Sequence, residues 1–239
     1  MNDISVINES TVVEVATDLS AVCRAIDFQV KEHFAPSWLI KKPPSITTMK
    51  EGNSKVLLVD DHAALSAYHD VYDEFLTVVF VKESIDAGYS WTVTLSHEIL
   101  EAIFDPNCDK SVKFGARIYA LEVCAPVQGD DESYEINGIK VSDFITPEWF
   151  TAGLAPNVHR DFTGCLFEPR TALTGSYYMV ADYRNGTFRR DPALSSVRPG
   201  TSGRSGYRIN GDRNWPKSDE TIEIPTMNII EVGAPVYHD

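Results

Sequence analysis

The 239-residue sequence has no apolar run long enough to cross a lipid bilayer. Basic residues are also few, because 21 Lys and Arg stand against 35 Asp and Glu, for a net charge of −14. A chain this acidic is a poor general binder of nucleic acids and anionic membranes, so we expect neither as a partner. The first nine residues lack the basic and then apolar pattern of a signal peptide, and we therefore expect a cytoplasmic protein.

Cysteine is scarce as well. The four cysteines contain no Cys-x-x-Cys pair, which argues against a zinc site made of thiolates. We expect small buried thiols in a reducing compartment, with a structural disulfide as the less favoured alternative. The residues concerned are Cys23, Cys108, Cys124 and Cys165.

The stretch 90–105 is predicted to be a helix. Its apolar residues suit a helix anchored in a core, and Pro106 ends it, because the residue before a proline is disfavoured in the helical region. His97 and Glu101 stand four positions apart and therefore share one helix face, with Glu98 between them. The predicted core positions are Leu95, Ile99, Ala102 and Ile103.

These residue types match what a hydrolytic metal site needs. A catalytic zinc takes three protein ligands and leaves one position for water. His97 can supply an imidazole nitrogen and Glu101 a carboxylate oxygen, while Glu98 can accept a proton from the metal-activated water. The alternative interpretation is structural: His97 bonds to a neighbour, and Glu98 and Glu101 form a solvated acidic face.

The string His97-Glu98-x-x-Glu101 resembles the His-Glu-x-x-His signature of the zincin metallopeptidases, with Glu101 in place of the second histidine. The resemblance implies a zinc-dependent peptidase that acts on a peptide or protein. In the gluzincin branch the third ligand is a glutamate at about the separation of Glu122, which is implied here as the third ligand. Asp105 is the alternative, although eight residues along a helix leave it rotated away from His97. A carboxylate in place of imidazole makes the site richer in oxygen, so calcium or manganese are alternatives to zinc.

The remaining patterns predict an α+β fold, with a zincin-like mixed sheet packed on the active-site helix. Residues 4–15 and 55–60 are predicted strands, residues 18–34 a helix with Thr17 or Asp18 as N-cap, and 134–141 a hairpin turning at Asn137-Gly138. Residues 75–82 form the best strand pattern. The zincin resemblance implies that this strand is an edge that binds peptide, and a central core strand is the alternative.

The amino-acid composition of the sequence changes near residue 170. We expect a zincin-like domain over 1–170 and an extension over 171–239 that ends in a strand. Residues 184–213 hold seven arginines, two aspartates and many Gly, Ser and Pro residues, which is typical of a long loop or arm. The alternating segment 221–232 either closes a sheet of its own subunit or pairs with a neighbour, so a homo-oligomer is a candidate assembly.

A second resemblance covers about residues 75–150. The segments Ser96–Glu101, Glu122–Cys124, Tyr134–Gly138 and Ser142–Phe144 are similar to an uncharacterised family of phage and bacterial genomes. It implies a viral or prophage setting and a virion-associated location. The sequence therefore supports two hypotheses: a metal-dependent peptidase, or a structural or attachment protein of a virion with a structural or vestigial metal site.

Overall fold

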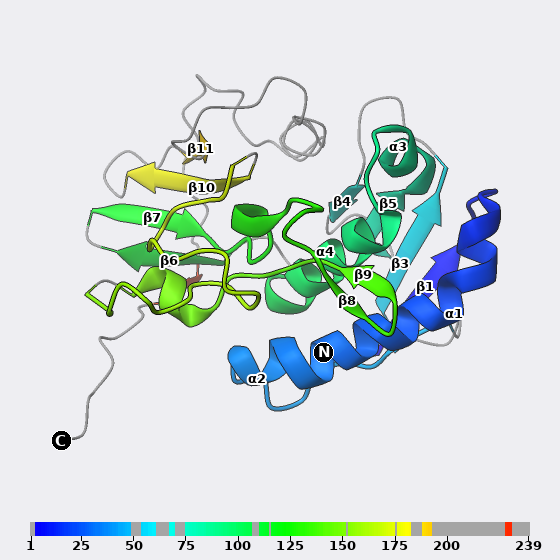
Figure 1. Cartoon of the computed structure of the whole chain (residues 1–239), viewed down its shortest axis with the longest axis horizontal. Coiled ribbons are helices and arrows are strands. Elements are labelled where there is room, and N and C mark those ends of the chain that lie inside the picture. Colours follow the sequence, from blue (N-terminus) through cyan, green and yellow to red (C-terminus); the bar gives the residue numbers. More distant parts are fainter. Residues whose placement is uncertain are drawn as a thin grey trace.

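The computed structural model confirms the predicted α+β class (Figure 1). The structure describes residues 3–48, 54–60, 67–69, 75–106, 110–114, 116–151, 153–174, 176–182, 188–192 and 228–230. This part of the chain forms two five-stranded sheets and a two-stranded hairpin around a central helix, α4 (Trp91–Phe104). No helix within it is both long and apolar enough to pass through a bilayer.

The first sheet is mixed, as predicted, and has the strand order β2-β1-β3-β5-β4. Three neighbouring pairs are parallel, and only β4 runs antiparallel to its described neighbour, β5. The edge role that the zincin resemblance implies for residues 75–82 is wrong, and the alternative of a central strand is confirmed, because β5 lies between β3 and β4 and both of its sides are paired. The strands are β1 (Ile4–Asn8), β2 (Ile46–Thr47), β3 (Ser54–Val59), β4 (Ala67–His69) and β5 (Phe75–Phe80).

The second sheet has the order β11-β10-β7-β6-β12 and joins strands from both sides of residue 170. The short strand β12 pairs in parallel with β6, so these three residues of the predicted C-terminal strand close a sheet of their own chain. The rest of 221–232, and most of the Arg-rich stretch 184–213, lie outside the described residues. The strands are β6 (Lys110–Phe114), β7 (Arg117–Ala120), β10 (Tyr177–Asp182), β11 (Phe188–Pro192) and β12 (Asn228–Ile230).

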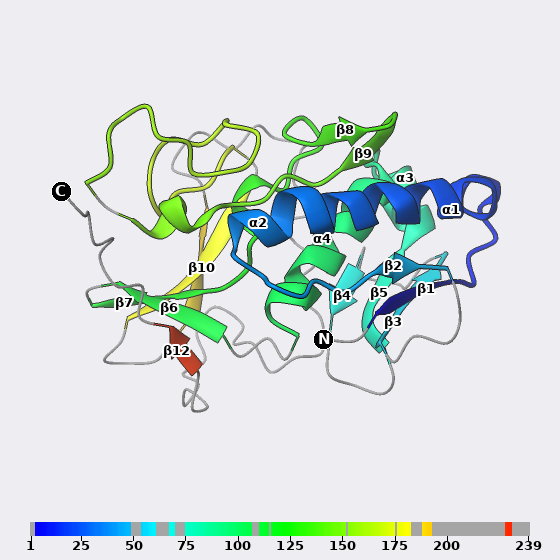
Figure 2. The same ribbon diagram turned by 90° about the horizontal axis from the view of Figure 1, so that it is seen from below.

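Two helices cover one face of the first sheet, and the hairpin lies on the other side of these helices (Figure 2). The long helix α1 (Val13–Phe28) continues as a π-helical segment, η1 (Gln29–Phe34), and then as α2 (Ala35–Ser37). Helix α4 packs against β5 and β4 on one side and against the hairpin on the other. The remaining elements are α3 (Val81–Asp86), the 3-10 turns η2 (Ala125–Val127) and η3 (Pro147–Phe150), and the hairpin strands β8 (Tyr134–Ile136) and β9 (Ile139–Val141).

Helix α1 begins at Val13, so the predicted N-cap at Thr17 or Asp18 is wrong. The predicted strand over residues 4–15 is confirmed only for Ile4–Asn8, because Val13 and Val15 lie in the helix. Valine favours a strand by its own preference, since β-branched side chains are stiff in a helix. A residue distant in the sequence overrides that preference. The Asp60 carboxylate, just after β3, accepts hydrogen bonds from the Ser10 hydroxyl at 2.6 Å and from the Thr11 hydroxyl and N–H at 2.6 and 2.8 Å.

We expect Asp60→Asn to destabilise the protein at neutral pH, and the difference from wild type to shrink near pH 3. The hydrogen bonds from Ser10 and then Thr11 lower the pKa of Asp60 below its ordinary 3.8. A lowered folded-state pKa adds stability that is present above the unfolded pKa and is lost as pH falls through the folded pKa. Urea unfolding at about pH 7 and pH 3 measures the effect. Asp18→Asn, at an exposed position, is the control; a difference for Asp60→Asn that is the same at both pH values would contradict the prediction.

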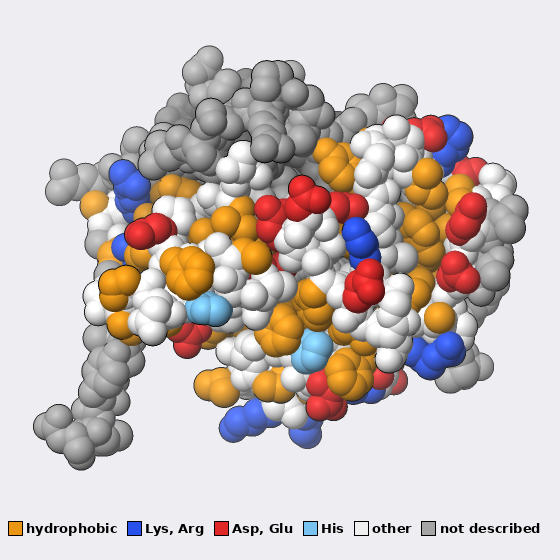
Figure 3. Space-filling view, viewed as in Figure 1, with side chains coloured by type: hydrophobic (Ala, Val, Ile, Leu, Met, Phe, Trp, Pro, Cys, Tyr) orange, Lys and Arg blue, Asp and Glu red, His pale blue; other side chains and the backbone are white. Residues whose placement is uncertain are grey.

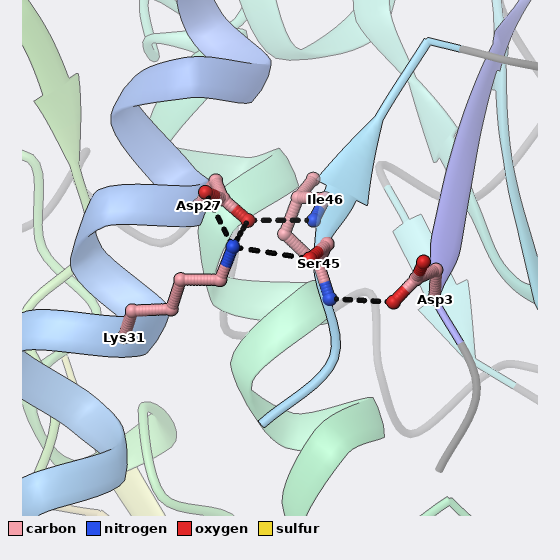
Figure 4. Close-up of polar contacts among 5 residues, drawn as sticks. All are labelled: Asp3, Asp27, Lys31, Ser45 and Ile46. Atoms are coloured by element: carbon pink, nitrogen blue, oxygen red, sulfur yellow. Dashed lines mark hydrogen bonds and ion pairs between the residues drawn. The ribbon is translucent and has the colours of Figure 1, made fainter. Parts of the chain in front are cut away.

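Helix α1 also holds the short strand β2 in place (Figure 4). The Asp27 carboxylate accepts the Ile46 N–H at 2.9 Å and pairs with Lys31 at 2.8 Å. Lys31 in turn donates to the Ser45 hydroxyl at 3.0 Å, and the Ser45 N–H donates to Asp3 at 3.0 Å. These bonds fasten an edge strand of only two residues to the helix above it.

The hairpin prediction is confirmed. β8 and β9 pair antiparallel, and the two turn residues, Asn137 and Gly138, have φ angles of 51° and 79°. Positive φ at both central positions is the conformation of the two-residue turn for which Asn-Gly is preferred.

The cysteines follow the prediction in part. Cys23 and Cys124 are buried free thiols, as expected. Cys165 is free but exposed, so the prediction of a buried residue is wrong there, because it lies in an irregular surface loop and not in a packed element. Cys108 lies outside the described residues.

Candidate active site on helix α4

Helix α4 has the predicted bounds, and it is buried on every side. Residues 91–103 are all buried, which marks a central core helix and not an amphipathic surface helix. The Asp130 carboxylate accepts the Ser90 N–H at 2.7 Å at the start of the helix, and Asp105 ends it. The predicted apolar anchors are in the core: Leu95, Ile99, Ala102 and Ile103.

The three motif residues are enclosed with the rest of the helix. His97 and Glu98 are each 3% exposed, and Glu101 is 1% exposed. The structural alternative, in which the two glutamates form a solvated acidic face, is therefore wrong about their surroundings. Ionisable side chains are almost never this buried unless they are paired or bind a ligand, because desolvation of a charge costs several kcal/mol.

The structure brings two of the predicted ligands together. His97 Nε2 lies 3.2 Å from Glu101 Oε1, the i, i+4 contact that the sequence predicts. Glu101 Oε1 also accepts the backbone N–H of Cys124 at 3.2 Å. This N–H belongs to the segment between β7 and η2, so a loop distant in the sequence fixes the rotamer of Glu101.

Glu122, the favoured third ligand, lies in that same segment, two residues before Cys124. The segment is held on both sides of Glu122, since the Leu121 N–H donates to the Lys110 carbonyl at 3.2 Å and the Val123 carbonyl accepts the Ile145 N–H at 2.8 Å. The fold thus carries Glu122 past helix α4, and its side chain is half-buried.

Asp105, the alternative ligand, has a structural role at the end of α4. It is 6% exposed, its N–H donates to the Glu101 carbonyl at 2.7 Å, and its Oδ2 accepts the Lys110 N–H at 3.0 Å. Asp105 therefore joins the helix end to β6.

The fit to a metal ion is partial. Within the residues that the structure describes, no group of three or more His, Cys, Asp or Glu side chains is arranged to hold an ion. His97 and Glu101 supply a nitrogen and an oxygen donor, which are two of the three ligands that a catalytic zinc requires. Neither Glu122 nor Asp105 completes the group with them in the described part of the chain.

Comparison of the chain with protein-family models, with curated proteins and with solved structures finds no match. The assignment of a function therefore depends on the residues and their geometry.

A set of buried hydrogen bonds next to the motif could not be predicted from the sequence. Gln29 of η1 is fully buried and donates from Nε2 to the Ser142 carbonyl at 2.7 Å. The Ser142 N–H donates to Ser96 Oγ at 2.6 Å, and Ser96 precedes His97 in α4. These hydrogen bonds join η1 to the motif turn of α4 through Ser142, the residue after β9. The signal in the sequence is a glutamine three positions after Ile26, on the apolar face that continues from α1 into η1.

Gln29 also donates to the Tyr134 hydroxyl at 3.1 Å, and that hydroxyl contacts His33 Nδ1 at 2.9 Å. Burial raises the pKa of Tyr134 and lowers that of His33. All three groups are satisfied when Gln29 donates to the Tyr134 hydroxyl and this hydroxyl donates to Nδ1 of a neutral His33. Tyr134 therefore belongs to the packing between η1 and the hairpin.

Proposed function

We propose that this chain is a metal-dependent peptidase with Glu98 as general base, in which His97 and Glu101 provide two ligands of a divalent ion, zinc first and calcium or manganese as alternatives. The observation that carries the proposal is the burial of three ionisable side chains on one turn of the central helix, two of them in contact. Ionisable side chains that are enclosed together are often found at catalytic sites.

Charge balance supports a divalent ion. Glu98 and Glu101 lie on one helical turn at 3% exposure or less, where an ionised carboxylate is costly to bury. A divalent cation held by His97 and Glu101 would stabilise the ionised carboxylates there, and neutral imidazole and carboxylate are the forms that ligate zinc.

The arrangement of the sheet also supports the proposal. In the zincins, which the motif resembles, an edge strand beside the active-site helix holds the peptide by strand addition. The described sheet has such a candidate in β4, which is antiparallel to β5 and packs against α4. A peptide that pairs with β4 would lie along the helix that carries the motif.

Each of the motif residues has a distinct role in this proposal. Glu98 would accept the proton of the attacking water and pass it to the leaving nitrogen, as a general acid–base residue does. The Cys124 N–H would hold the Glu101 carboxylate beside His97 Nε2, so that both side chains face one ion. A bound zinc would supply Lewis acidity and lower the pKa of its water toward about 7. The third ligand is proposed to be Glu122, with Asp105 second.

The test is the metal content of the purified protein. We expect about one equivalent of a divalent ion per chain after expression with added zinc, and loss of this ion in the double variant His97→Ala, Glu101→Gln. Glu135→Gln, at an exposed position of β8, changes one charge without touching the helix and is the control. Purified protein without stoichiometric metal, under conditions where it remains folded by circular dichroism, would contradict the proposal.

A structural or attachment protein of a virion is the second candidate. The incomplete ligand group within the described residues favours it, since a vestigial site needs no third ligand. It predicts metal without turnover, or no metal at all. It also predicts homo-oligomers or particles in analytical ultracentrifugation that are lost when the chain is cut near residue 184, and circular dichroism must show that the shortened chain, which lacks β11 and β12, remains folded.

A further inference from the structure

Four aromatic side chains from distant parts of the chain meet in one partly exposed surface beside the hairpin. This aromatic surface consists of Phe28 at the end of α1, His33 of η1, Tyr134 of β8 and Phe162 of the loop after η3. Phe28 is 46% exposed and Phe162 is 37% exposed. On the molecular face shown in Figure 3, hydrophobic and histidine side chains lie side by side, and acidic side chains stand among them. Exposed apolar side chains that gather in one place, rimmed by polar residues, mark a surface that binds a partner.

The rings of the aromatic surface pack on one another, with His33 at their centre. The Phe28 ring meets the His33 ring edge-on with ring centres 5.3 Å apart, and the Phe162 ring stacks on His33 at 4.6 Å. The Tyr134 ring lies 5.6 Å from His33 and 5.2 Å from Phe162. The Tyr134 hydroxyl, which accepts from Gln29, contacts His33 Nδ1 at 2.9 Å. The rings are therefore held in place before a partner binds.

The charges beside the aromatic surface favour a cation. Burial lowers the pKa of His33, and the charge of the exposed Glu32 opposes this shift, so His33 is neutral at pH 7. The basic side chains nearby on the same helix are directed elsewhere. Lys31 pairs with Asp27 at 2.8 Å, and Arg24 donates to a serine hydroxyl one turn earlier at 2.8 Å. Neutral rings and a negative carboxylate thus lie together.

An arginine side chain has the chemistry that this surface fits. Its guanidinium is planar, stacks on aromatic faces and is more weakly hydrated than an ammonium group. Aromatic rings attract it through the cation–π interaction, and a neighbouring carboxylate accepts its N–H groups. The protein contains one such contact within its own fold, since the guanidinium carbon of Arg170 lies 3.9 Å from the centre of the Phe114 ring.

The chain itself contains a complementary segment. Residues 198–213 hold four arginines and one aspartate, whereas the whole chain has a net charge of −14. This segment follows β11 and precedes β12, and both strands belong to the second sheet. The second sheet and helix α1 lie at opposite sides of the molecule (Figures 1 and 2). The two complementary parts therefore belong to different halves of one copy, which favours a contact between copies.

We propose that two copies of this chain form a dimer, in which arginines of residues 198–213 of each copy bind the aromatic surface of the other. Reciprocal contacts of this kind close a two-fold dimer, because each copy offers one basic segment and one aromatic surface. The opposite charges of the segment and the acidic chain also guide the encounter of the two copies. The dimer does not depend on the chemistry of α4, so it is compatible with either candidate function.

Sedimentation of the intact chain over a range of protein concentrations tests the dimer. We expect a reversible dimer at low salt that is weakened by about 1 M sodium chloride, because salt screens charges that remain partly exposed. Phe28→Ser is expected to weaken the dimer at least about tenfold, since each copy loses a cation–π contact. Ile85→Ser is the matched control, because it makes the same kind of change at a 41% exposed position of α3, and it is expected to dimerise as the wild type does.

The basic segment has a test that requires no variant of the folded chain. A synthetic peptide of residues 198–213 is expected to compete for the aromatic surface and to convert the wild-type dimer into monomers. A peptide in which glutamine replaces the four arginines is expected not to compete; its changes are Arg198→Gln, Arg204→Gln, Arg208→Gln and Arg213→Gln.

A wild-type protein that remains a monomer at every concentration would overturn the proposal. A dimer that Phe28→Ser leaves unchanged would overturn it too, because the aromatic surface would then play no part in association. Equal competition by the arginine and glutamine peptides would show that the guanidinium groups are not recognised, and the proposal would fail on that result as well.

Discussion

Replacing Glu98 by Gln is expected to lower the rate of peptide hydrolysis by about 10²–10⁴-fold, the usual contribution of a general acid–base residue. Glutamine keeps the size of the side chain but cannot accept the proton of water at neutral pH. Because Glu98 is 3% exposed within a packed helix, an isosteric change is the least disruptive choice. Release of fluorescent fragments from labelled casein measures the rate.

Glu135→Gln is the matched control, since it makes the same chemical change at an exposed position and should retain wild-type activity. The Glu98→Gln protein should also keep the metal content and melting temperature of the wild type, because Glu98 is not one of the proposed ligands. Full activity in Glu98→Gln would remove Glu98 as the base. Absence of hydrolysis in the wild type, with metal bound, would favour the virion candidate.

Trp149→Ala is expected to lower the free energy of unfolding by about 3–5 kcal/mol, the range for a buried tryptophan. Trp149 of η3 is 1% exposed and packs edge-on against Tyr119 of β7 and Tyr178 of β10, with ring centres 5.7 and 5.6 Å apart. Its Nε1 donates to the Thr171 carbonyl at 2.8 Å. The truncation would leave a cavity against the second sheet and a carbonyl without its donor.

Urea unfolding gives the free energy of each variant. Ile85→Ala, at the 41% exposed end of α3, is the comparison and should change the free energy by about 0.5 kcal/mol or less. Similar losses for the two variants would show that η3 is not coupled to the core.

Elements that depend on neighbouring residues could be predicted from the sequence. Helix α4 has the expected bounds, because its start, its periodicity and the Asp105-Pro106 stop lie within sixteen residues. The Asn137-Gly138 hairpin is equally local. The same is true of the pair His97 and Glu101, because a spacing of four on a helix brings the two side chains to one face.

Elements that depend on distant residues could not be predicted. The sequence places the start of α1 too late, because Asp60, which holds the preceding turn, follows a strand that is distant in the sequence. The sequence leaves an edge and a central position open for β5, because its own residues do not show that β4 covers its second side. The buried Gln29 depends in the same way on Tyr134 and Ser142, which lie more than a hundred residues away.

The sequence by itself determined the α+β class, the central helix and the spacing of its motif, since periodicity and turn residues act over a few positions. Only the tertiary structure decided that the motif is enclosed, that the Cys124 N–H holds Glu101, and that the buried Gln29 bonds to Tyr134 and Ser142. The physical reason is that burial and pairing depend on what packs against a residue, and long-range contacts supply those neighbours.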